Sequence, residues 1–112
     1  MNTDRMTYSY QALNHARAMG KEINWTAKRK QDHFPIACEV KKLFAYCEEN
    51  INACLFGYEH SYIKDYFNAA YDYKHWSMKD LNEKLKECKR FLNWELGEIY
   101  HGMLIGEYPT RE

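Results

Sequence analysis

The sequence contains little glycine and proline, the residues that most often mark turns. Five glycines and two prolines occur in 112 residues. An all-β sandwich or barrel needs a turn signal about every 8–12 residues, and no such spacing is present. The sequence therefore predicts an all-α fold, in which residues 1–112 form one domain. We expect a small bundle of three to four helices with a long C-terminal helix.

Long hydrophobic runs and an excess of charge of either sign are also missing. No apolar run approaches the roughly 20 residues that span a bilayer, and the N-terminus MNTDRMTYSY lacks the apolar region of a secretory signal. Sixteen basic and sixteen acidic side chains give a formal net charge of zero. The totals therefore exclude an overall acidic or basic surface of the kind that DNA mimics or nucleic-acid-binding proteins carry. We expect a cytoplasmic protein that does not contact membranes.

The cysteines lack the paired spacing of a zinc site. Cys47 and Cys54 would share a helix face, but two helical turns, about 10 Å, separate them, which is too far to bind one ion together. Buried, reduced thiols are therefore expected at all four positions: Cys38, Cys47, Cys54 and Cys88.

The clearest element that is present is a long helix near the C-terminus. Ser77 is a predicted N-cap with Asp80 at the third helical position, and Trp76 and Leu81 have the spacing of a hydrophobic staple. Apolar residues then recur at steps of three and four until Gly106 ends the helix. About 28 residues make a helix of roughly 40 Å, which would protrude from a compact chain about 34 Å across. A second copy or another partner is expected to cover the overhang.

A helical hairpin is predicted before this helix. The first arm begins at Asp32 or His33, because Pro35 is well tolerated in a first turn, and Gly57 ends it after about 22 residues. The second arm covers 59–75. The short connection at Gly57 indicates that the two arms are antiparallel.

The N-terminal region has a weaker helical pattern. A helix is predicted roughly over 4–19, with Gly20 as its stop. Residues 21–34 are expected to form a linker or irregular segment, and residues 1–3 and 107–112 are expected to fray.

The second arm of the hairpin has a wider aromatic arc than a helix needs for packing on a core. Two interpretations are open. The tyrosine rings cover the edge of the core with their hydroxyl groups in water, or they form a surface for a partner, because Tyr, Trp and Arg dominate interface hot spots. The candidate partner-binding residues are Tyr58, Tyr62, Tyr66, Tyr73 and Trp76.

A non-enzymatic protein-protein interaction module is the favoured functional hypothesis. It follows from the aromatic arc, the long helices, and the lack of a nucleophile elbow or glycine-rich phosphate loop in the sequence. The partner is expected to be a protein, with a homodimer as one option, and no cofactor is expected. A short chain of this kind is typical of accessory regulators or inhibitors encoded by phages or mobile elements.

Nucleic-acid binding is the first alternative. Lys28, Arg29 and Lys30 could contact phosphates while Trp25 stacks on a base. Three adjacent cations are also typical of a plain solvated segment.

A metal-dependent helical hydrolase is the second alternative. Glu95, Glu98 and His101 follow one another at three-residue steps on one side of the last helix. Di-iron helical bundles use Glu-x-x-His spacing, but they need two such motifs and two further Glu, whereas one motif is present here. Magnesium-dependent helical pyrophosphohydrolases use an ExxE followed by an ExxD, and no ExxD follows here. A solvated polar face explains the same three residues.

Overall fold

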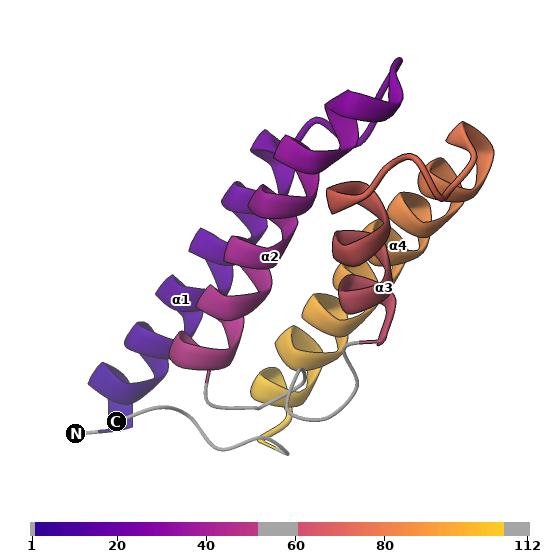
Figure 1. Ribbon diagram of the computed structural model, residues 1–112. Helices are drawn as coiled ribbons and strands as arrows, with labels where there is room; N and C mark the ends of the chain where they lie inside the picture. The colour runs from indigo at the N-terminus through magenta and orange to yellow at the C-terminus, as the bar shows by residue number, and fades with distance from the viewer. Residues whose placement is uncertain (1, 52–60, 107–112) are drawn as a thin grey trace.

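The protein is an all-α bundle, as predicted. The computed structural model describes the backbone of residues 2–51 and 61–106 and the side chains from Tyr10 onward within these ranges (Figure 1). This part contains no strand, and none of its helices combines the length and apolarity needed to cross a membrane. Its helical elements are α1 (Asn2–Glu22), the short 3-10 helix η1 (Lys30–Asp32), α2 (His33–Asn50), α3 (Ser61–Tyr71) and α4 (Met78–Leu104).

Successive α-helices run in alternating directions along one long axis (Figure 1). α2 packs on α1 and α3, α3 packs on α4, and α4 also contacts α1. The principal extents are 52 × 23 × 18 Å and the radius of gyration is 15.2 Å, against about 13 Å for a compact chain of this length. The 27 residues of α4, about 40 Å, fit along the 52 Å axis. The expected overhang of this helix was therefore wrong, because the whole bundle is elongated.

Helix α4 forms as its local sequence signals predict. The Ser77 hydroxyl accepts a hydrogen bond from the Asp80 amide at 3.0 Å. At the C-terminal end, Gly106 has a φ of 78°, a left-handed conformation that glycine adopts without strain. Its amide donates a hydrogen bond to the Met103 carbonyl. The apolar stripe between these ends is no more than 4% exposed and comprises Leu81, Leu85, Cys88, Leu92, Leu96, Ile99 and Met103.

Helices α2 and α3 end earlier than predicted. α2 stops at Asn50, where Ile51 turns to extended backbone with φ −108° and ψ 120°. Ile51 nevertheless stays 3% exposed, so the apolar pattern continues into the core after the helix has ended. α3 ends at Tyr71 rather than His75 because a turn follows, in which the His75 amide bonds the Asp72 carbonyl. Gly57, with the predicted connection, lies outside the described residues.

Helix α1 continues past Gly20, which was predicted to end it. The indole nitrogen of Trp25 donates a hydrogen bond to the Gly20 carbonyl at 2.8 Å, which satisfies a carbonyl of the last turn. A Cβ at Gly20 would lie 3.3 Å from Cδ2 of Leu92, so the glycine instead serves a close contact between α1 and α4. Ile23 and Ala27 are each 6% exposed. The predicted linker therefore contributes these side chains to the packed core, although half of residues 21–34 are exposed.

The cysteines that the structure describes are free thiols, as predicted. Cys47 and Cys88 are buried, and Cys38 is partly buried. Cys54 lies outside the described residues.

Replacing the Ser77 cap should destabilise the bundle. Ser77→Ala removes the bond to the Asp80 amide, and we expect the free energy of unfolding to fall by about 1 kcal/mol. Urea denaturation followed by circular dichroism measures this change. Ser77→Asp is the matched control, since aspartate caps as well as serine does. An equal loss in both variants would contradict the assigned cap.

Candidate functional site

The tyrosines of α3 do not share one exposed face. Tyr62 is 39% exposed, whereas Tyr66, one turn later, is 0% exposed. The inclusion of Tyr66 in a partner-binding surface is therefore wrong for this fold. Tyr58 lies outside the described residues, so the predicted column is represented at the surface by Tyr62.

Tyr66 is buried because its hydroxyl has polar partners inside the core. It donates to the His33 carbonyl at 3.3 Å and lies 3.0 Å from Nδ1 of the His33 ring. His33 itself is 0% exposed, and burial lowers the pKa of its imidazole against a smaller opposing effect of Asp32. Burial also raises the pKa of Tyr66. Both groups are therefore held neutral, and the pair connects the start of α2 to the middle of α3.

Tyr73 and Trp76 cover the end of the core between α3 and α4. Both side chains are partly buried and pack against the core cluster. They fit the interpretation in which aromatic rings seal the edge of the core. Neither side chain lines the hollow beside Tyr62 that is described next.

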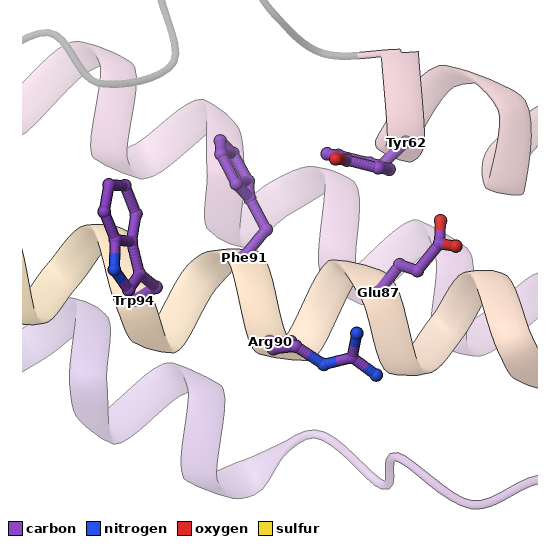
Figure 2. Close-up of a pocket in the computed structure, with 5 residues that line it drawn as sticks. All are labelled: Tyr62, Glu87, Arg90, Phe91 and Trp94. Atoms are coloured by element: carbon purple, nitrogen blue, oxygen red, sulfur yellow. The ribbon is translucent and has the colours of Figure 1, made fainter.

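A hollow of about 350 Å³ lies where the start of α3 meets α4 (Figure 2). The ring centroids of Tyr62 and Phe91 are 5.6 Å apart, and Trp94, which is 62% exposed, stands beside Phe91 on the same helix. We call this hollow the aromatic pocket, and its lining residues are Tyr62, Glu87, Arg90, Phe91 and Trp94.

Sequence reasoning missed Phe91 and Trp94. Both fall outside the buried stripe of α4, which passes through Leu92 and Leu96. Large aromatic residues beside an amphipathic stripe were the available signal. The hydrophobic period alone could not show that Tyr62 of α3 packs against Phe91.

The two charged residues of the aromatic pocket have different surroundings. The Lys84 ammonium lies 3.4 Å from the Glu87 carboxylate and 5.6 Å from the centre of the Tyr62 ring. Arg90 is exposed, and it has no hydrogen bond or ion pair to any residue in the described ranges. Figure 2 shows its guanidinium extending from α4 away from the three rings. The pocket thus combines an apolar wall with an unpaired cation at its rim.

Two of the three cations in the nucleic-acid alternative lie together, since Lys28 and Arg29 line one hollow with Asp32, and Trp25 is not among the residues that line it. The half-buried Trp25 ring has its nitrogen bonded to Gly20 and the Lys89 ammonium 6.0 Å from its centre. Arg29 forms an ion pair with Asp32 at 2.7 Å. Lys28 is exposed and Lys30 is partly buried. Two members of the predicted set are therefore engaged within the chain.

The predicted metal ligands do not form a metal site. Across the side chains described in 10–51 and 61–106, no three His, Cys, Asp or Glu residues are placed to hold an ion. Glu98 and His101 are exposed, and Glu95 is partly buried. Burial, and then the charge of Glu98, raise the pKa of Glu95. The helical spacing puts these side chains near one another without making them converge.

Comparisons with protein-family models, curated proteins and solved structures find no match to this chain. The candidate site therefore depends on its geometry and chemistry alone.

Removing the Tyr66 hydroxyl should test its structural role. Tyr66→Phe removes the hydroxyl that contacts Nδ1 and the carbonyl of His33, and we expect a loss of about 1–3 kcal/mol in the free energy of unfolding. Tyr62→Phe is the matched control, because the Tyr62 side chain is at the surface. Urea denaturation of both variants measures the difference, and an equal effect would refute the buried bond.

The neutral His33 should make folding sensitive to mild acid. Its pKa in the folded chain is below the ordinary 6.5, so the unfolded chain binds more protons as the pH falls. The contribution of neutral His33 to the free energy of unfolding should therefore be fully present above about pH 6.5. It should decrease as the pH falls from there towards the pKa of the folded chain. Denaturation midpoints between about pH 7.5 and 5.5 measure this trend.

His75→Gln is the control for this pH dependence, because His75 is exposed and contacts Asp72 at 2.9 Å. The His75→Gln variant should therefore lose stability below about pH 6.5 as the wild type does. A stability that is flat over the same interval, or an NMR titration of the His33 ring at or above pH 6.5, would contradict the assignment.

Proposed function

We propose that this protein is a non-enzymatic accessory protein, a regulator or inhibitor, that binds another protein through the aromatic pocket. The observation that carries the proposal is the exposure of Trp94, at 62%, beside a hollow that Tyr62 also lines. Trp, Tyr and Arg are the residues most enriched in interface hot spots. The aromatic pocket brings all three types together at one place.

The shape and charge of the pocket indicate the chemistry of the partner. A hollow of about 350 Å³ with mostly apolar walls suits a large apolar side chain of the partner as an anchor. Arg90 at the rim would pair with a carboxylate next to that anchor, since charge-assisted bonds to guanidinium are strong and directional. The proposed partner segment therefore presents an aromatic or long aliphatic residue beside Asp or Glu.

The reactive groups of the core favour binding over catalysis. Burial raises the pKa of Cys47 and of Cys88 to about 12, so neither thiol is a nucleophilic thiolate at neutral pH. His33 and Tyr66 are both 0% exposed, which prevents contact with a substrate in this conformation. These groups support packing in the described structure.

A second exposed aromatic cluster supplies a control surface. Tyr71 is 70% exposed, and its ring centroid lies 5.5 Å from that of Phe34. The Lys41 ammonium lies 4.3 Å from the centre of the neighbouring Phe67 ring. The cation of this cluster already has an aromatic partner, unlike Arg90.

Substitutions in the aromatic pocket should weaken partner binding selectively. Trp94→Ala and Tyr62→Ala are each expected to lower the affinity at least about tenfold, because they remove hot-spot rings. Arg90→Glu should also weaken binding by repelling the partner carboxylate. Affinity purification with quantitative mass spectrometry identifies the partner, and titration calorimetry with the purified partner measures each affinity.

Tyr71→Ala is the matched control, since it removes a more exposed ring outside the pocket. It should change the affinity less than about threefold. Equal recovery and affinity for the wild type and for Trp94→Ala would refute the proposal. Light scattering of the purified protein measures its mass in solution and so shows whether the captured protein is a second copy of this chain.

A further inference from the structure

Glu87 and Lys89 of α4 lie on different flanks of this helix. Glu87 lines the aromatic pocket beside α3 and is paired with Lys84. Lys89 lies over Trp25, whose nitrogen bonds α1 at Gly20, so Lys89 is on the flank that faces α1. Lys89 is therefore separated in space from Glu87, which Lys84 and Arg90 accompany at the aromatic pocket.

Helix α1 adds two cations to the same flank. Arg17 and Lys21 line a groove of about 360 Å³ together with Asn93 of α4. Glu22 is the only acidic residue among residues 10–22, and it lines a different hollow with Met19 and Lys42, towards α2. The described part of α1 thus presents cations without acidic residues to this groove.

The close contact between α1 and α4 gives the groove its floor. Gly20 approaches Leu92 closely, and both residues line the groove together with Leu96. The Arg17 guanidinium lies 4.9 Å from the centre of the Tyr100 ring, which steadies its position above the seam. Cations from two helices are therefore held beside one narrow depression.

We propose that this basic groove binds the phosphodiester backbone of a nucleic acid. Its donors come from two helices that are far apart in sequence, and Lys86 extends the cation track one helical turn from Lys89. This site is distinct from the predicted Lys28–Lys30 cluster and needs no base stacking by Trp25. Arg17, Lys21 and Asn93 line the groove itself. Lys89, which lies over Trp25, and Lys86, one helical turn before it, are on the adjoining surface of α4, and we call these five residues together the basic groove.

The composition of the groove favours phosphate over an acidic protein surface. Lysine is depleted in protein-protein interfaces, which have an apolar centre. Protein-nucleic acid interfaces are more polar and strongly positive, and Arg, Lys and Asn are common phosphate donors. Because the whole chain has a formal net charge of zero, attraction of a polyanion has to come from a local cluster such as this one.

The rings of the aromatic pocket and the groove lined by Arg17, Lys21 and Asn93 are on different sides of α4, so the rings and the α1 cations can be tested separately. If the wild-type protein binds its protein partner but no nucleic acid, the proposal for the basic groove fails and the proposal for the aromatic pocket stands. Trp94→Ala, which changes the pocket, should leave nucleic-acid binding unchanged.

Fluorescence anisotropy with labelled oligonucleotides tests the groove. Single-stranded DNA, single-stranded RNA and duplex DNA form separate arms, because all three carry the same phosphodiester chemistry. With contacts from the four cations, the slope of log K against log salt should be about −2.8 for single strands and about −3.6 for a duplex. Binding in any arm with such a slope supports the proposal.

Paired substitutions locate the contacts. Arg17→Gln with Lys21→Gln should weaken binding at least about tenfold at low salt and make the single-strand slope less steep by about 1.4. Lys86→Gln with Lys89→Gln should do the same on the α4 side. Lys42→Gln with Lys64→Gln is the control, since it removes two exposed cations elsewhere and changes the net charge equally.

Three outcomes would overturn the proposal. They are no binding in any arm at about 50 mM salt, an equal loss in the Lys42 and Lys64 control, and an effect confined to Lys28→Gln with Lys30→Gln. Binding of polyglutamate without binding of nucleic acid would assign the groove to an acidic protein instead. Thermal melts by circular dichroism confirm that each variant is folded.

Discussion

The structure depends on one apolar stripe along α4. This stripe is no more than 4% exposed, and the helix that carries it contacts both α1 and α3. Since turning α4 about its axis would expose the stripe, packing fixes which residues lie on its two flanks. One flank acquires the rings beside Tyr62, and the other acquires the cations beside α1. Burial of the core therefore decides where the surface chemistry is placed.

The sequence predicted well those elements whose signals are local. The cap at Ser77, the period of the α4 stripe and the stop at Gly106 all lie within a few residues of the structure they determine. The ends of α1 and α2 could not be predicted in this way. α1 continues because Trp25 reaches back to the Gly20 carbonyl, and α2 stops although Ile51 remains buried. A buried apolar residue does not have to be helical.

The candidate site was only partly predictable, because its residues meet across helices. Tyr62 and Tyr66 have the same residue type and helical spacing, yet only Tyr66 finds a polar partner in the core, 33 residues away at His33. The spacing of Tyr66 from Ile63 and Ala70 places it on the buried face of α3, but it could not show which polar group receives the hydroxyl. Phe91 and Trp94 were likewise missed because Tyr62, which lines the same hollow, belongs to another helix. The functional roles of Tyr62 and the other surface residues stay predictions.

The elongated shape of the bundle affects how the molecule reorients in solution. Helical N–H bonds point along their helix axes, and the helices follow the 52 Å dimension. Their nitrogen relaxation therefore reports mainly end-over-end rotation, which is the slowest rotational mode of a rod. Two copies joined end to end would lengthen that correlation time far more than two copies joined side by side. Relaxation rates of the helical amides thus contain the geometry of any self-association.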